Sequence, residues 1–230
     1  MKPVYVYKYL PLIEEQRLKW FVEILKTGNI WFSKFHALND PMEGVYYSYY
    51  SKLNNLIASK KNEYLIGSFG NKPNNFVLWA YYTNGYRGAC IEIELNKLSM
   101  ENIHKVKYCT NAEFNESVDL TIDKVDLLLK RKLNSWKNEA ELRILLKKEV
   151  FGSDLENYVN VGTIKKVILG INIGSEAVEC LRHLAEINVS TEFEWTIASP
   201  DKKELPKSVN LECIIDVLDT YNKWRENFSI

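Results

Sequence analysis

Charged and apolar side chains alternate along residues 139–144, where the charged members are Glu139, Glu141 and Arg143. A period of two predicts a β-strand with the charges on one face and the apolar side chains on the other. Two carboxylates beside a guanidinium suit an active site, because such close like charges are unfavourable until a cation or a substrate relieves them. The alternative is a helix, in which Glu139 and Arg143 form an ordinary i,i+4 surface ion pair.

The composition predicts a soluble globular protein. Hydrophobic residues make up 46% and aromatic residues 13% of the 230 positions, which is enough to build a core. Thirty basic and thirty acidic residues give a formal net charge of zero, which argues against a protein held to nucleic acid by bulk charge. The zero net charge does not exclude a local basic patch. We expect one domain over residues 1–230, with a C-terminal helix over residues 208–230 packed on it or extending it.

The cysteines predict a reduced, cytoplasmic protein. They are scattered and form no CxxC pair, which is typical of packed thiols rather than of a disulfide framework or a zinc site. The three histidines are equally dispersed, so no metal site is predicted. The first ten residues lack the apolar region of a signal peptide, and no stretch is long enough to span a membrane. We therefore expect no membrane partner.

The apolar periodicity predicts an α+β chain. Strands are expected at residues 4–10, 30–32, 64–69, 87–95, 104–109, 136–146, 165–169 and 193–198. Helices are expected at residues 18–27, 45–58, 77–85 (a short helix or turn), 117–133, 175–184 and 211–227. Gly28 is predicted to end the first helix and Ser175 to cap the fifth. In the strand 87–95, Cys90 is expected on the face opposite Ala89.

Four stretches, taken together, resemble a bacterial family of unknown function, DUF2971. They are Tyr-Lys-Tyr at 7–9, Phe-His-Ala-Leu-Asn-Asp-Pro-Met-Glu at 35–43, Ser-Phe at 68–69 with the aromatic run from 79, and Trp-Lys-Asn-Glu-Ala-Glu-Leu-Arg at 136–143. Their order and spacing match from about residue 5 to residue 170. The resemblance implies a setting in mobile elements or phage defence and brings no settled activity.

The motif order is also remotely similar to the ADP-ribosyltransferase fold. That similarity implies mixed and antiparallel sheets of a split-barrel kind, flanked by helices, with NAD as the substrate. The residue that grips NAD on an early strand would be Lys8, the serine of a middle strand Ser68, and the catalytic glutamate Glu139 or Glu141. The usual first residue is arginine or histidine. Lysine departs from it, because an ammonium grips phosphate as a point charge rather than as a bidentate fork.

The resemblance to NAD-consuming enzymes gives the charged stretch a role. Cleavage of the nicotinamide–ribose bond passes through an oxocarbenium-like state, which a carboxylate stabilises. We assign that role to Glu141, with Glu139 activating or orienting the acceptor. Arg143 would keep the pair ionised or meet a phosphate. The alternative is a structural ion-pair network.

Aromatic residues follow Ser68 and Phe69 in the sequence, and their role has two interpretations. Trp79 and Tyr82 are candidates for stacking on a nicotinamide or a nucleobase. Aromatic clusters more often belong to the core. Ser68 would hydrogen-bond a ribose hydroxyl or, alternatively, the backbone. Lys8 is either the phosphate contact or a solvated charge on an edge strand.

Three functions compete on this sequence. An NAD-consuming enzyme, which binds a nucleotide and modifies a protein or nucleic-acid acceptor or water, predicts Lys8, Ser68 and Glu141 in one cleft. A nucleic-acid enzyme or binder predicts a basic groove from the runs at 130–132 and 147–148. A non-catalytic interaction module predicts that the charges of residues 139–143 pair only with one another and that the C-terminal helix docks a partner.

Overall fold

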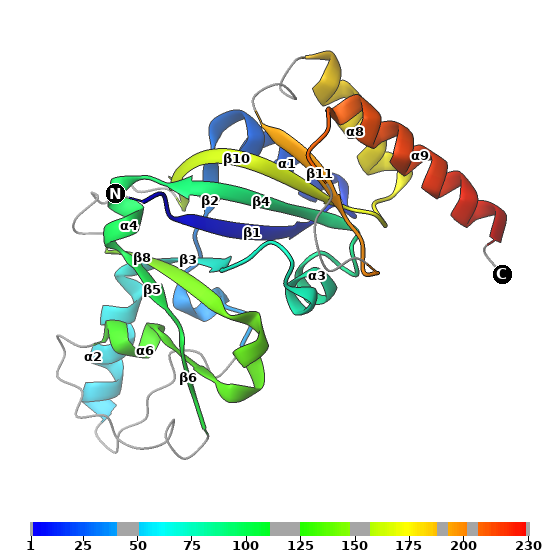
Figure 1. The fold of residues 1–230 in the computed structure, drawn as a ribbon. Helices are drawn as coiled ribbons and strands as arrows, with labels where there is room; N and C mark the ends of the chain where they lie inside the picture. Colours follow the sequence, from blue (N-terminus) through cyan, green and yellow to red (C-terminus); the bar gives the residue numbers. More distant parts are fainter. Residues whose placement is uncertain are drawn as a thin grey trace. The chain divides into compact units, whose positions relative to one another are not determined.

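The computed structural model describes residues 2–40, 51–110, 125–147, 157–187, 193–201 and 207–228. The chain is mixed α+β, and most of its strand pairs are antiparallel, as predicted (Figure 1). It divides into two compact units. Unit 1 comprises residues 1–29, 70–96 and 160–230, and unit 2 comprises residues 30–69 and 97–159. Each unit is therefore assembled from segments that are separated in sequence.

Unit 1 is built on four long strands. They are β1 (Tyr5–Pro11), β4 (Gly88–Leu95), β10 (Gly162–Gly170) and β11 (Glu194–Ala198), hydrogen-bonded in the order β11-β10-β4-β1. β4 runs antiparallel to both neighbours, and β11 runs parallel to β10. Ala89 and Cys90 are both fully buried, so β4 is covered on its two faces. The predicted outward position of Cys90 is wrong, because a central strand is packed from both sides.

The described part of unit 1 also contains four helices. They are α1 (Glu15–Thr27), α3 (Phe76–Tyr82), α8 (Ser175–Glu186) and α9 (Leu211–Phe228). α1 ends as predicted at Gly28, whose φ of 70° is left-handed and whose N–H donates to the Ile24 carbonyl at 2.8 Å. The predicted cap at Ser175 is wrong: Gly174 precedes α8 and no side chain caps it.

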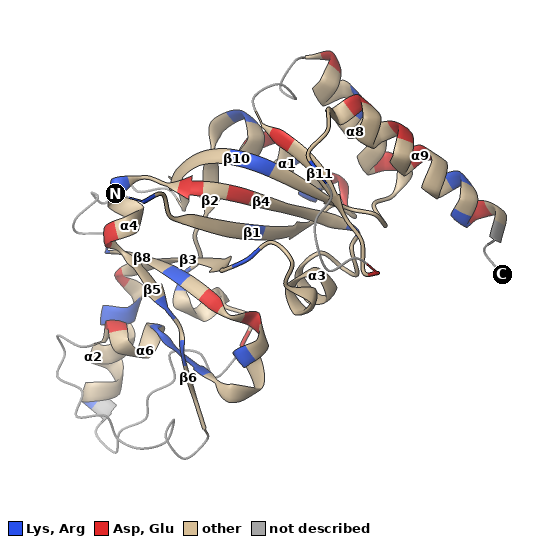
Figure 2. Cartoon of the chain, in the orientation of Figure 1, with Lys and Arg blue, Asp and Glu red and all other residues tan. Residues whose placement is uncertain are grey.

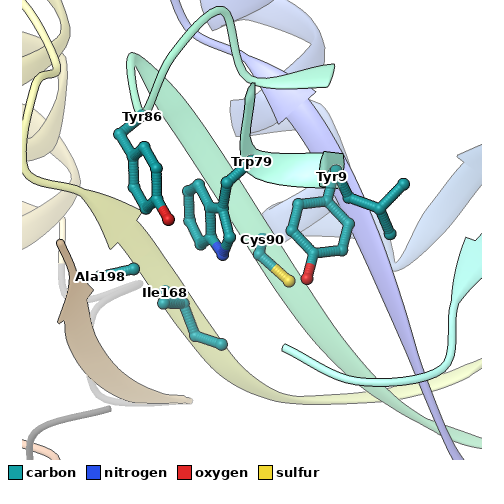
Figure 3. Close-up of a cluster of buried hydrophobic side chains, with 7 residues drawn as sticks. Tyr9, Trp79, Tyr86, Cys90, Ile168 and Ala198 are labelled. Carbon is teal, nitrogen blue, oxygen red and sulfur yellow. The ribbon is translucent and has the colours of Figure 1, made fainter. Parts of the chain in front are cut away.

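The core of unit 1 contains an aromatic cluster of Tyr9, Trp79 and Tyr86 around Cys90 (Figure 3). The Trp79 ring stacks on Tyr86 with centroids 5.0 Å apart, and Tyr9 meets its edge at 5.4 Å. Tyr86 is the third of three consecutive left-handed residues, with a φ of 64°. A Cβ on Gly170 would lie 2.2 Å from the Tyr86 carbonyl oxygen, so only glycine fits beside this turn.

Unit 2 holds shorter elements. Its strands are β2 (Asn29–Trp31), β3 (Tyr64–Gly70), β5 (Ile103–Lys105), β6 (Lys107–Cys109), β7 (Arg131–Leu133), β8 (Glu141–Lys147) and β9 (Tyr158–Asn160). Among the described residues of unit 2, the helices are η1 (Phe35–Ala37), α2 (Ser51–Asn62), α4 (Lys97–Glu101), α6 (Asp126–Leu129) and η3 (Asn134–Glu139). The end residues Asn29, Gly70 and Asn160 belong to unit 1, where Gly70 pairs with Tyr7 of β1.

The pairing in unit 2 positions the charged stretch. β8 lies between β3 and β5, antiparallel to β5, while β6 pairs in parallel with β7 and β2 pairs with β9. Ile66, Leu129 and Leu145 form one buried cluster. A second contains Ile57 from α2 and Leu128 from α6. β8 is therefore fixed by strand pairing and by packing.

Three predictions for unit 2 need correction or fall outside the described residues. The helix predicted over 117–133 ends earlier, because residues 131–133 form β7, and residues 111–124 are not described. The strand predicted over 104–109 is two strands that pair with different partners. Of the helix predicted over 45–58, residues 45–50 are not described.

Candidate functional site

The predicted strand over residues 136–146 begins later than expected. Residues 134–139 form η3, Ala140 adopts a left-handed conformation with φ and ψ of 48°, and β8 starts at Glu141. Glu139 is therefore not on the strand, and its predicted alternation with Glu141 and Arg143 is wrong. The turn at Ala140 nevertheless brings Glu139 back to the same place as Glu141, because both carboxylates contact Lys132.

Four charged side chains meet inside unit 2, and we call Lys132, Glu139, Glu141 and Arg143 the buried tetrad. The Lys132 Nζ atom donates to Glu139 Oε2 at 2.7 Å and to Glu141 Oε2 at 3.2 Å. The Arg143 guanidinium makes two parallel hydrogen bonds to the Glu141 carboxylate: Nε donates to Oε1 at 2.7 Å and Nη2 donates to Oε2 at 3.0 Å. All four are between 1% and 7% exposed. Two cations and two carboxylates are thus buried together, and their summed charge is zero.

Neighbouring groups hold the tetrad in place. Arg143 Nη1 donates to the Leu129 carbonyl at 2.7 Å, and the Glu141 backbone N–H donates to the Tyr108 hydroxyl at 2.8 Å. The Trp136 ring centroid lies 4.9 Å from Lys132 Nζ, within the range of a cation–π contact. β6, β7, η3 and β8 therefore all contribute to one polar network, which fixes each charge in a single orientation.

Glu141 is held in its ionised form. Burial by itself raises the pKa of its carboxyl group, but the charges of Arg143 and Lys132 and hydrogen bonds from Arg143 and Ser68 outweigh burial. Together they lower the pKa of Glu141 from 4.5 to about 2. Burial raises the pKa of the adjacent Tyr108 phenol, with smaller contributions from Glu141 and Glu139. At neutral pH the site therefore presents a carboxylate beside a neutral phenol.

The lowered pKa of Glu141 predicts a specific acid sensitivity. Because the folded-state value of about 2 lies below the unfolded value near 4.5, ionised Glu141 stabilises the fold above that value. The contribution, on the order of 3 kcal/mol, is lost as the pH falls from 4.5 towards 2. We expect the difference in urea unfolding between the wild type and Glu141→Gln to be largest at pH 6 and to fall by more than half by pH 3. A constant difference over this range would contradict the assignment.

The predicted site residues fall into two groups. Ser68 lies with Glu141 in unit 2, and its hydroxyl donates to the Glu141 carboxylate. Lys8 and Tyr82 are half-buried residues of unit 1. Trp79 is 1% exposed in the core of unit 1, which is the alternative that its sequence context left open. The convergence of Lys8 with Ser68 and Glu141 stays a prediction.

Lys132 belongs to the site, although its sequence context predicts another role. The basic run at 130–132 predicts that Lys132 lines a nucleic-acid groove. In the structure Lys132 is buried against two carboxylates, and Lys130 pairs with Asp126 on the preceding turn. No local sequence pattern sets Lys132 apart, because its burial follows from its place at the centre of the short strand β7 between two half-buried neighbours. Of the second basic run, at 147–148, the structure describes Lys147 and does not describe Lys148.

Comparison with protein-family models, with curated proteins and with solved structures finds no match for this chain. The similarity to DUF2971 therefore stays a prediction. Over the described ranges, no three histidine, cysteine or acidic side chains gather as metal ligands would. None of the helices in those ranges has the length and apolar character that crossing a bilayer requires. The cysteines are all free thiols.

Proposed function

We propose that this protein is an NAD-consuming enzyme of the split-barrel, ADP-ribosyltransferase-like kind, with Glu141 as the carboxylate that acts on the ribose. One observation carries the proposal: Ser68 of β3 hydrogen-bonds the ionised carboxylate of Glu141, the first residue of β8. A serine on a middle strand and a glutamate on a late strand are the two residues that the remote similarity assigned to NAD. Their direct contact supports that assignment, although the two residues are far apart in the sequence.

The proposed reaction breaks the bond between ribose C1′ and the nicotinamide nitrogen. The bonding electron pair leaves with nitrogen, which turns the cationic pyridinium into neutral nicotinamide and leaves positive charge on C1′ and the ring oxygen. An oxygen nucleophile, either water or an acceptor hydroxyl, then bonds to C1′ and releases one proton. Glu141 stabilises the developing cation through its negative charge. Its low pKa suits this electrostatic role better than that of a proton acceptor.

The other members of the tetrad support this role of Glu141. Arg143 keeps the carboxylate ionised and fixes its plane through two parallel hydrogen bonds. Glu139 is held by Lys132 at 2.7 Å, next to Glu141, where it would orient the incoming acceptor. Lys132 balances the second carboxylate, since two adjacent carboxylates would otherwise repel each other. The acceptor, whether water, protein or nucleic acid, is left open by this chemistry.

The proposal is tested by measuring nicotinamide release from NAD. We expect Glu141→Gln to lower the rate at least 100-fold, because the amide keeps the shape of the carboxylate and loses its charge. Ser68→Ala should lower the rate less, since it only frees Glu141 to move. Glu15→Gln makes the same chemical change at an exposed helix position and should leave the rate unchanged. Circular dichroism would establish that each variant is folded at the assay temperature.

Two results would reject the enzyme proposal. One is the absence of nicotinamide release by the folded wild type with water, protein or nucleic acid as the acceptor, together with no shift of the melting temperature on adding NAD. The other is release that persists at the wild-type rate in Glu141→Gln. Loss of release in Glu141→Gln with retained NAD binding would instead separate the chemistry from substrate binding.

A second candidate is a non-catalytic interaction module, in which the tetrad only stabilises unit 2. The observation that favours it is the saturation of Glu141: Arg143 and Lys132 make three contacts to its two oxygens, and the residue is 7% exposed. A carboxylate neutralised in this way stabilises a ribose cation less well. This candidate predicts that Glu141→Gln lowers the free energy of unfolding. It also predicts that the wild type neither releases nicotinamide nor shows an NAD-dependent shift of its melting temperature.

A further inference from the structure

Helix α9 packs on the described residues of unit 1 through one side. Leu211, Ile214, Ile215 and Leu218 are buried on that side. Arg182 of α8 forms an ion pair with Asp219. Farther along, the Tyr221 hydroxyl donates to the Asn172 side chain at 3.3 Å, and Arg225 donates to the Asn172 carbonyl at 3.5 Å. These contacts fix the orientation of α9 and therefore determine which residues face outward.

The outward side of α9 carries two large apolar side chains. Val217 is 50% exposed and Trp224 is 54% exposed. They are seven residues apart, or two turns, so they lie on one face with Thr220 between them. The Tyr221 ring stacks against Trp224 with centroids 5.8 Å apart, which holds the indole in place. A positioned tryptophan beside a valine is an apolar surface of the kind that anchors protein interfaces.

The charges beside this apolar stripe differ between the two halves of the helix. Both signs of charge occur along α9 (Figure 2): exposed Glu212 and Asp216 lie in the first half, and the second half carries Lys223 and Glu226, both exposed, and half-buried Arg225. Asp216 and Lys223 are also seven residues apart, so they flank the same edge of the stripe. A partner helix that matches these two charges must present a basic residue to Asp216 and an acidic residue to Lys223.

A reversed copy of α9 meets this requirement. We propose that α9 is a self-association surface, on which α9 of a second copy of this chain docks antiparallel about a twofold axis near Thr220. The axis places Val217 against Trp224 of the second copy, and Asp216 against Lys223 of the second copy, twice by symmetry. A parallel arrangement brings each edge of the stripe against the opposite edge of the second helix, so Asp216 and Lys223 would not meet. The positions of these two charges therefore favour the antiparallel pairing.

Sedimentation equilibrium on the full chain tests this proposal. We expect a concentration-dependent dimer, and Trp224→Ala should raise its Kd by about 30-fold or more, because buried tryptophans dominate such interfaces. Phe76→Ala removes an exposed aromatic of α3, 63% exposed, and should leave the Kd unchanged. A wild type that stays monomeric at several hundred micromolar, or equal Kd values for wild type and Trp224→Ala, would overturn the proposal.

Charge exchange tests the antiparallel register without touching the apolar stripe. Asp216→Lys alone and Lys223→Asp alone should each raise the Kd by about 5-fold to 10-fold, because each sets like charges against each other. The double variant Asp216→Lys/Lys223→Asp should return to within about 3-fold of the wild type. Both positions are exposed, so folding is not at issue. A double variant weaker than both single variants would exclude this register.

A distance measurement provides an independent check. Cys213 is exposed, whereas Cys90 and Cys109 are buried, so a spin label attaches at Cys213 once the half-buried Cys180 is replaced by serine. In the proposed dimer the two Cys213 Cα atoms are about 20–25 Å apart, from a rise of 1.5 Å per residue and an interhelical distance of about 9 Å. Parallel helices would bring them to within about 10 Å. A short distance of that kind would contradict the proposal.

Discussion

Replacing Arg143 with methionine will destabilise the fold by about 3–5 kcal/mol. Arg143 is 1% exposed and makes two hydrogen bonds to Glu141 and one to the Leu129 carbonyl. Its removal leaves Glu141 and Glu139 buried with Lys132 as their sole cation within the tetrad, so one negative charge is uncompensated. Methionine fills most of the volume, which confines the effect to charge and hydrogen bonding. Urea unfolding followed by circular dichroism measures the loss.

A double variant separates charge imbalance from packing. Arg143→Met combined with Glu141→Gln removes one charge of each sign and leaves Lys132 paired with Glu139. We expect the double variant to be about 2 kcal/mol more stable than the sum of the single effects implies. Lys19→Met, which breaks an exposed ion pair on α1, should show no measurable change. An Arg143→Met variant within 1 kcal/mol of the wild type would contradict the buried network.

Replacing Trp79 with alanine will cost about 3–5 kcal/mol of stability. The indole is 1% exposed, stacks on Tyr86 at 5.0 Å and donates from Nε1 to the Pro73 carbonyl at 2.8 Å. Truncation opens a large cavity beside Tyr9 and leaves that carbonyl without its donor. Thermal and urea unfolding both measure the effect.

Tyr81 is the matched control for Trp79, because it lies two residues farther along α3 and is 74% exposed. Tyr81→Ala should change the free energy of unfolding by less than about 0.5 kcal/mol. The pair also decides between the two interpretations of Trp79. A Trp79→Ala variant that keeps its stability and loses NAD binding would restore the stacking role proposed from the sequence, whereas the structure predicts the reverse.

Several elements could be predicted from local patterns alone. Gly28 ends α1, β4 covers almost the whole predicted strand, and α9 spans the predicted helix. These features depend on side chains a few residues apart, which periodicity and glycine conformations report directly. The same holds for the pairing of Glu141 with Arg143, since alternate residues of one strand share a face.

Local patterns failed where long-range packing decided the outcome. Residues 131–133 continue an apolar helical pattern yet form β7, because β6 supplies a strand to pair with. Alternation along β4 predicts Cys90 on an outer face, but both faces of this strand are covered and Cys90 is buried.

The sequence by itself determined that Glu141 and Arg143 share one face of a strand, and the remote similarity indicated Ser68 and Glu141 for one site. Only the tertiary structure decided that the charges are buried, that Lys132 joins them, and that Glu139 reaches them through the left-handed Ala140 rather than along a strand. The physical reason is that burial and ion pairing depend on which segments meet in space. Residues 68, 108, 132 and 141 come from separate strands, and no local period relates them.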